Sequence, residues 1–217
     1  MGSVPYRPPD GAIDPAGGGA MRRQVGRAVL TLLRYRVVGD PPQAPAYVLI
    51  AAPHTSWLDL PLMLGIAWSS GIVPGFLAKK ELFRPPFGAM LRGVGAIRVD
   101  REDPGTLVAD LAARAASGAP FALVIAPEAT RGRAEGWKTG FYRIAREADV
   151  PLVLGFVDGP TRTGGFSPTI RPSGDLAADM ETIRAFYADK HGVVPDRASP
   201  VVVRSGPVDR APGAAAG

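Results

Sequence analysis

Short apolar runs alternate along the chain with longer segments in which apolar residues recur every three or four positions. The short runs are typical of buried strands and the longer period of amphipathic helices. The pattern predicts strands at 46–52, 75–79, 96–100, 121–126, 151–157, 168–172 and 201–205. It predicts helices from about Ser56, within 81–95 after an early break at Pro85 and Pro86, from Pro104 (capped by Asp103) to Gly118, over 140–148, and from Asp175 to Lys190. Strands that alternate with helices favour an α/β fold with a largely parallel central sheet flanked by helices.

The segment 21–38 combines apolar and basic residues in a helical pattern. The apolar residues fall near one face and arginines supply charge elsewhere, which predicts an amphipathic helix. Such a helix could cover the core or rest on an anionic membrane surface, and the two arrangements are compatible. The apolar residues are Val25, Val29, Leu32 and Leu33, and the arginines are Arg22, Arg23, Arg27 and Arg34.

Residues 60–78 are uncharged over about the length that a membrane span needs. Small and helix-breaking residues interrupt them, so we expect a buried helix, a turn and a strand, with a membrane-inserted hairpin as the alternative. The interrupting residues are Gly65, Ser69, Ser70, Gly71, Pro74 and Gly75.

The two ends of the chain differ from its middle. Residues 1–20 are rich in glycine and proline and lack the apolar core of a signal peptide. Glycine, alanine and proline also dominate the last residues. We therefore expect a disordered tail at 1–20, a single domain at 21–205 and a second disordered tail at 206–217.

Composition narrows the chemistry. Hydrophobic residues make up 46% of the 217 positions, enough for one core, and there is no cysteine. The lack of cysteine excludes disulfides, thiolate metal sites and a cysteine nucleophile. A net charge of +5 favours an anionic partner such as a phosphate group, an anionic lipid or a nucleic acid. Since no recognised nucleic-acid motif accompanies the charge, we expect no nucleic-acid partner.

The chain contains two histidines. His191 ends the last predicted helix just before Gly192, where a cation complements the helix C-terminus, so we expect a structural role. His54 instead follows the apolar run 46–52, and ligands of parallel sheets bind outside the carboxyl ends of the strands. If His54 precedes the next helix, Asp59 in its first turn can reach back and fix the imidazole tautomer. The alternative is a capping aspartate near an incidental loop histidine.

Two other catalytic schemes do not fit the sequence. One histidine with scattered carboxylates is no recognisable set of metal ligands, so we expect no metal. A Ser-His-Asp hydrolase is disfavoured because the chain has no Gly-x-Ser-x-Gly elbow.

Cations recur where predicted strands end. If these ends share one rim of the sheet, the rim carries a base and a cradle for an anion, and guanidinium groups suit phosphate through paired hydrogen bonds. Lys79 and Lys80 follow the apolar residues 75–78, and Arg98 and Arg101 lie in the strand 96–100 and at its exit. Arg131, with Glu128 and Thr130, follows 121–126.

Four short motifs resemble, in order and spacing, those of the glycerolipid acyltransferase family, the lysophosphatidic acid acyltransferases and their relatives. The likeness covers about 45–158, and Ala129 and Gly155 depart from it, where the family has glycine and often proline. The motifs read HTSWLD (54–59), GAIRVDR (95–101), EATR (128–131) and VPLVLGF (150–156). FLAKKELFRPPFG is similar to the family's linker, and WKTGFYRIA and DMETIRAFYADKHG resemble a compact bacterial branch.

The resemblance implies a fold like that of the glycerol-phosphate acyltransferases and a role for each matching residue. His54 would be the general base and Asp59 its partner. The residues implied to hold the acceptor phosphate or to shape its site are Arg101, Arg131, Lys79, Lys80, Glu128 and Thr130. Alanine resists the positive φ that glycine permits, which makes the backbone at Ala129 a point of interest.

The implied reaction moves a fatty acyl group from acyl-CoA or acyl carrier protein directly to a hydroxyl, most simply of 1-acyl-glycerol 3-phosphate, without a cofactor. The departures at Ala129 and Gly155 leave open another lysolipid, a glycolipid or a specialised metabolite as acceptor. The basic segment 21–36 leaves open a catalytically degenerate module that binds membrane surfaces. The expected location is the cytoplasm, peripheral at the inner face of the membrane.

Overall fold

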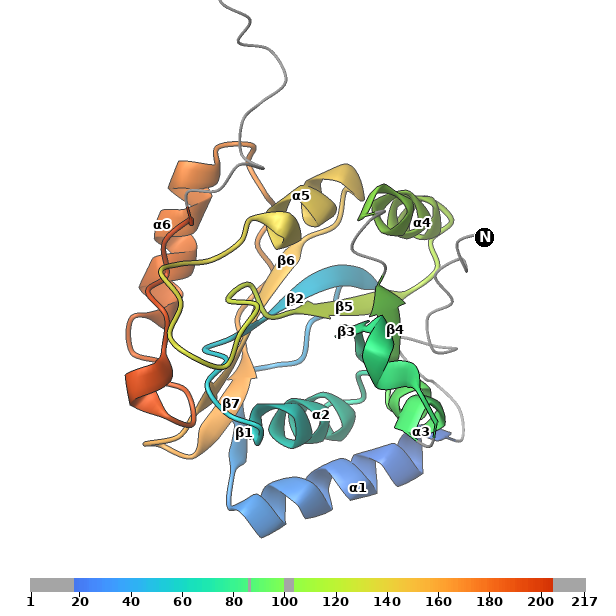
Figure 1. The fold of residues 1–217 in the computed structure, drawn as a ribbon, viewed down its shortest axis with the longest axis vertical. Coiled ribbons are helices and arrows are strands. Elements are labelled where there is room, and N and C mark those ends of the chain that lie inside the picture. Colours follow the sequence, from blue (N-terminus) through green and yellow to red (C-terminus); the bar gives the residue numbers. More distant parts are fainter. Residues whose placement is uncertain (1–17, 86, 100–103, 205–217) are drawn as a thin grey trace, which may run out of the picture.

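The computed structural model describes residues 18–85, 87–99 and 104–204. Within them, seven strands form one sheet in the order β1-β7-β6-β2-β5-β3-β4 (Figure 1). Neighbouring strands are parallel except β6 and β7, which are antiparallel. The largely parallel sheet expected from the sequence is thus confirmed. The strands are β1 (Arg36–Val38), β2 (Ala46–Ala52), β3 (Gly75–Lys79), β4 (Ala96–Val99), β5 (Phe121–Ile125), β6 (Leu152–Asp158) and β7 (Thr163–Phe166).

Helices cover both faces of the sheet (Figure 1). In β2, Tyr47 and Leu49 pack into the core on the side of α1 and α2, whereas Val48 and Ile50 pack into the core on the side of α4, α5 and α6. Burial on both faces explains why this strand is apolar at every position. The helices are α1 (Gly18–Leu33), α2 (Asp59–Ser69), α3 (Phe87–Gly93), α4 (Pro104–Ala116), α5 (Gly140–Glu147) and α6 (Leu176–Tyr187), with short 3-10 turns η1 (Lys80–Phe83) and η2 (Pro195–Arg197).

The first helix is shorter at its C-terminal end than the amphipathic helix predicted for 21–38. Arg34 takes a left-handed conformation with φ of 59°, which ends α1, and residues 36–38 form β1 instead. Val37 and Val38 suit a strand because β-branched residues pack well on a pleated sheet. At its other end α1 begins at Gly18, inside the segment expected to be a tail.

The face of α1 that packs against α2 also differs from the predicted apolar face. A Cβ on Gly26 would lie 2.8 Å from the carbonyl oxygen of Gly65, so glycines allow the two helices to approach closely. Leu30 is buried beside them, whereas Val25 and Leu32 are exposed. A pattern of apolar residues misses this contact because the residues that make it are small.

Three further differences concern strands with weak sequence signals. β7 was not predicted because its sequence, TGGF, lacks an apolar pattern. A Cβ on Gly165 would lie 1.8 Å from Val38 O, so the close pairing of β7 with β1 requires glycine at this position. Where strands were predicted at 168–172 and 201–205, the described residues 168–172 and 201–204 form single bridges, Ile170 to Leu152 and Val203 to Trp137. One bridge satisfies only part of a strand's backbone groups.

The uncharged segment 60–78 folds as expected, into the buried helix α2, a turn and β3. Among the helices that the structure describes, none is both long and apolar enough to cross a bilayer. The cap predicted at Asp103 and the tail predicted at 206–217 lie outside the described residues.

Candidate active site

The loop between β2 and α2, residues 53–58, carries His54 and is called the His54 loop below. Asp59 is the first residue of α2, so its side chain can turn back toward the loop. Asp59 Oδ2 lies 2.9 Å from His54 Nδ1 and accepts hydrogen bonds from the N–H groups of Thr55 (2.7 Å) and Ser56 (2.8 Å). One carboxylate oxygen therefore shapes the loop and orients the imidazole. The helix starts at Asp59 rather than at Ser56, which leaves His54 outside it, as the pairing requires.

The side chain of Glu128 holds the backbone of the His54 loop through a hydrogen bond. It follows β5, the strand beside β2, and its Oε1 accepts the backbone N–H of His54 at 2.6 Å. The side chain is buried, and this burial raises the pKa of Glu128 against the lowering effect of the hydrogen bond from His54. Glu128 does not line the cleft described below, so it holds the backbone of His54 rather than a ligand.

The turn after Glu128 contains the alanine that replaces the motif glycine. Ala129 adopts a left-handed conformation with φ of 56°. For an L-residue other than glycine this conformation costs about 1–2 kcal/mol. Thr130 closes the turn by accepting the N–H of Gly132 at 3.2 Å. The chain thus keeps the backbone shape that glycine favours, in spite of the substitution.

Arg131 follows this turn, and its side chain contacts Trp57 of the His54 loop. Its Cζ is 3.3 Å from the ring centroid of Trp57, a residue that is 76% exposed. A guanidinium stacked on an indole is held flat, and its N–H groups remain available at the edge. Sequence reasoning named Arg131 but missed Trp57, although it lies inside the HTSWLD motif.

A cleft of about 1180 Å³ opens at the carboxyl end of the sheet. His54, Asp59, Trp57 and Arg131 line it, and most of its other lining residues are apolar. Both layers of the fold contribute, because Met63 and Ile66 come from α2 and Phe141 and Ile144 from α5, with Phe156 and Phe166 from β6 and β7. A long apolar chain would fit this lining, with its polar end beside His54.

The remaining cations predicted for the rim are only partly described. Lys79 ends β3 and Lys80 begins η1, two strands from β2 on the same edge, and Arg98 lies near the end of β4. Arg101 lies outside the described residues. Two exposed cations that line the cleft were missed, Arg84 and Lys138, although each belongs to a segment that resembles the family.

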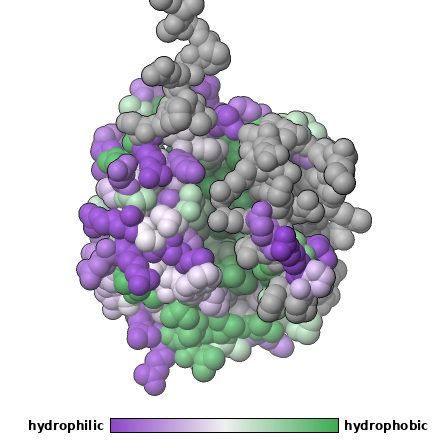
Figure 2. Space-filling view, viewed as in Figure 1, coloured by the Kyte–Doolittle hydropathy of each residue, from purple (hydrophilic) through white to green (hydrophobic). Residues whose placement is uncertain are grey.

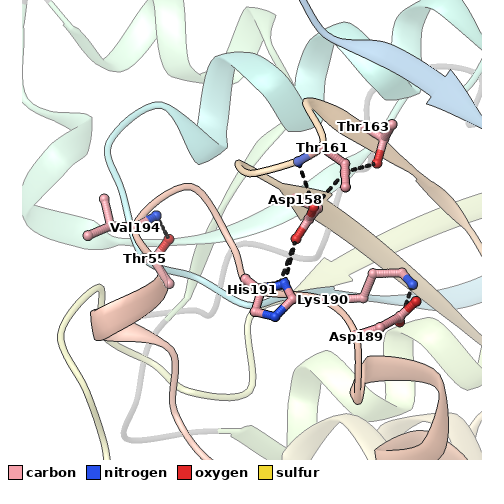
Figure 3. A network of polar contacts seen from close by, with 8 residues as sticks. All are labelled: Thr55, Asp158, Thr161, Thr163, Asp189, Lys190, His191 and Val194. Carbon is pink, nitrogen blue, oxygen red and sulfur yellow. Dashed lines mark hydrogen bonds and ion pairs between the residues drawn. The ribbon is translucent and has the colours of Figure 1, made fainter.

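The second histidine has a partner that the sequence did not indicate. His191 lies beyond α6, and its N–H and Nδ1 are 2.8 Å and 3.3 Å from Asp158 Oδ1, at the end of β6 (Figure 3). Asp158 also accepts the N–H and hydroxyl of Thr161. His191 therefore binds a buried carboxylate rather than the carbonyl end of the helix. Within the described residues, no three His, Cys, Asp or Glu side chains gather as metal ligands would.

Comparison with known proteins agrees with this fold. Residues 34–153 match the model of the acyltransferase family, and the chain belongs to that family. The fold is similar to the crystal structure of the 1-acyl-sn-glycerophosphate (LPA) acyltransferase PlsC from Thermotoga maritima, with a TM-score of 0.53 and 17% identity over 79% of this chain and 75% of that chain. No curated protein sequence matches the chain. The family resemblance seen in the motifs is therefore confirmed.

Proposed function

We propose that the protein moves a fatty acyl group from an acyl thioester to a hydroxyl of a lysophospholipid, most simply 1-acyl-glycerol 3-phosphate. The observation that carries this proposal is the His54–Asp59 pair in the wall of a large, mostly apolar cleft. A base in such a cleft suits a substrate that is polar at its reacting end and long and apolar elsewhere.

The geometry supports a direct transfer with His54 as general base. Because Asp59 accepts the Nδ1 proton, Nε2 of His54 is left as the acceptor for the hydroxyl proton. The hydroxyl oxygen attacks the thioester carbonyl, a C–O bond forms, the C–S bond breaks, and the thiolate takes the proton from Nε2. A general base of this kind contributes roughly 10²–10⁴-fold to the rate. The protein needs no cofactor in this scheme, since acyl-CoA or acyl carrier protein is a co-substrate.

The acceptor phosphate would bind at Arg131. Its guanidinium lines the cleft and is held against Trp57, so a phosphate could accept paired hydrogen bonds from it. Thr130 shapes the turn beside it, and Glu128 fixes that turn to His54. Lys79 and Lys80, at the end of β3 on the same edge of the sheet, are further candidates for the acceptor anion. Arg101 is a candidate from its motif in the sequence alone.

The outer face of α1 supports a peripheral position on a membrane. Met21, Val25 and Leu32 recur at helical spacing on this face, with exposed fractions of 69%, 43% and 81%. Figure 2 shows hydrophobic residues gathered at the end of the molecule where α1 and α2 lie in Figure 1. The net charge of +5 would favour anionic lipid, although the exposed Arg23 and Arg27 lie on the side of α1 away from this face. We place this face on the inner, cytoplasmic surface of the membrane.

An acyl-transfer assay tests the reaction. Acyl-CoA or acyl carrier protein donors of several chain lengths are incubated with 1-acyl-glycerol 3-phosphate, and free thiol and phosphatidate are measured. We expect both products in equal amounts. Arg131→Ala should raise the acceptor KM by about tenfold or more and leave the donor KM unchanged, because one charge-assisted contact contributes about 1.5–3 kcal/mol. Turnover only with an unphosphorylated lysolipid or a glycolipid would instead identify a different acceptor.

Vesicle sedimentation tests the membrane surface. The protein should sediment with vesicles that contain anionic lipid, and Leu32→Glu should weaken this binding. Val202→Glu is a matched control, since Val202 is also exposed but lies near the C-terminal end of the described chain, away from α1. Equal binding of the two variants would exclude α1 as the contact.

A further inference from the structure

The loop that follows α6, residues 188–194, lies against the His54 loop and is called the C-terminal loop here. The N–H of Val194 donates a hydrogen bond to Thr55 Oγ1 at 3.0 Å (Figure 3). Thr55 is fully buried, and its own N–H donates to Asp59 Oδ2. Thr55 therefore joins the C-terminal loop to the carboxylate that orients His54.

The other side of the C-terminal loop is fixed to the end of β6, the strand that neighbours β2. Asp158 accepts the N–H of His191 at 2.8 Å, and Gly159 donates its N–H to the carbonyl of Gly192, also at 2.8 Å. Asp158 is 1% exposed, and Thr161 satisfies its second oxygen. The loop thus spans two neighbouring strand ends, with a buried polar anchor at each.

The contact between the two loops leaves no space. Gly192 has a φ of +73°, and a Cβ there would lie 2.9 Å from both Cγ2 and Oγ1 of Thr55. Any side chain at this position would push on Thr55. The position of the His54 loop is therefore coupled to the position of the C-terminal loop by direct contact as well as by a hydrogen bond.

We infer that Thr55 is a positioning residue for His54, and that the C-terminal loop holds it in place. Thr55 does not line the cleft, so it acts through its neighbours rather than on a substrate. The anchoring residues Asp158, His191, Gly192 and Val194 all lie outside the segment 34–153 that matches the family model. This chain therefore completes its site with residues from beyond that segment. The inference rests on the proposed function of His54.

The test compares Thr55→Val with Thr55→Ser in the full-length protein. Valine keeps the shape but cannot accept the N–H of Val194, whereas serine keeps the hydroxyl. We expect kcat to fall about tenfold in Thr55→Val with little change in either KM, since small displacements of a catalytic group reduce the rate strongly. Thr55→Ser should recover most of that loss.

A second pair of variants separates positioning from stability. Gly192→Ala and Gly118→Ala place alanine at nearly the same backbone angle, φ of +73° and +72°, but a Cβ at Gly118 meets nothing within 4 Å. Both variants should lower the melting temperature. Only Gly192→Ala should lower kcat and speed hydrogen exchange of the amides of residues 54–58, by about tenfold.

The outcomes distinguish this inference from the proposed function. Hydrogen exchange needs no substrate, so it reports on the loop even if the acceptor is wrong. If His54→Ala abolishes turnover while Thr55→Val and Gly192→Ala match Gly118→Ala in kcat and exchange, the positioning role is wrong and the base stands. If His54→Ala keeps full turnover, the proposed function is wrong. If Thr55→Val does not fold, Gly192→Ala against Gly118→Ala decides the question.

Discussion

Two histidine–aspartate pairs lie at neighbouring strand ends of this sheet, one after β2 and one after β6. His54 Nδ1 lies 2.9 Å from Asp59 Oδ2, and His191 Nδ1 lies 3.3 Å from Asp158 Oδ1. In both pairs the carboxylate also accepts two backbone N–H groups. They are those of Thr55 and Ser56 for Asp59, and those of Thr161 and His191 for Asp158. By residue type and partner the two pairs are nearly equivalent.

The two histidine–aspartate pairs differ in their surroundings. The side chain of His54 is 23% exposed and lines the apolar cleft, whereas that of His191 is 56% exposed and lies outside it. A base must lie where a substrate can reach it and where water is partly excluded. A histidine held by an aspartate is therefore not evidence of catalysis by itself, and the cleft decides which pair can act on a substrate.

The largest expected effect comes from removing each histidine in turn. His54→Ala should lower kcat about a thousandfold, because general-base catalysis is lost. His191→Ala should lower it by less than tenfold, because the backbone N–H of residue 191 still reaches Asp158. Steady-state thiol release measures both. Equal losses in the two variants would remove the distinction drawn between the pairs.

The next effect comes from changing the first carboxylate to an amide. Asp59→Asn keeps the shape, but an amide does not hold the Nδ1–H tautomer or stabilise the imidazolium that forms in the transition state. We expect kcat to fall about a hundredfold with a small change in KM. An unchanged kcat in a folded Asp59→Asn variant would show that Asp59 serves only to hold the N–H groups of Thr55 and Ser56.

Asp158, the carboxylate of the second pair, should affect the free energy of unfolding in a way that depends on pH. Burial by itself raises the pKa of Asp158, but hydrogen bonds from Thr161 and His191 outweigh it and lower the pKa below the ordinary 3.8. The ionised form therefore stabilises the fold above that pH, and this stabilisation is lost as the pH falls through the lowered pKa. Urea unfolding should show Asp158→Asn less stable than the wild type at pH 7, with a difference that shrinks below about pH 3.8. A difference that is constant with pH would contradict the assignment.

The smallest expected effect comes from the turn at Ala129, which adjoins the His54–Asp59 pair. Ala129 has a φ of 56°, so Ala129→Gly should relieve strain and raise the free energy of unfolding by about 1 kcal/mol or less, after the entropic cost of glycine. Asp149→Gly is a control with a similar φ of 49° at an exposed position away from the cleft. Urea unfolding should show a gain for Ala129→Gly and a smaller change for Asp149→Gly, because aspartate tolerates this conformation better than alanine and its exposed ion pair with Arg171 is lost. Destabilisation by Ala129→Gly alone would mean that the alanine methyl makes a contact the turn needs.

Much of the fold followed from local patterns in the sequence. The strands β2, β3, β5 and β6 and the helix α6 have strong apolar signals, and each lies within a few residues of its predicted position. β7 was missed because two of its four residues are glycines, whose importance lies in a contact with another strand. The face by which α1 meets α2 was missed for the same reason. Apolar periodicity reports on a residue's own side chain and not on how closely another backbone can approach.

The candidate site likewise has one part that the sequence predicts and another that it does not. His54 and Asp59 are five positions apart, and once a strand before and a helix after them are recognised, their contact is a local matter that the sequence by itself determined. The bond from His54 to Glu128 joins residues 74 positions apart, and that from Val194 to Thr55 joins residues 139 positions apart. These depend on strand order, because β2 lies between β5 and β6. The turn after β5 and the C-terminal loop anchored at the end of β6 therefore flank the His54 loop. Only the tertiary structure decides which strands are neighbours, since burial and pairing of the whole sheet select that order and no single segment encodes it.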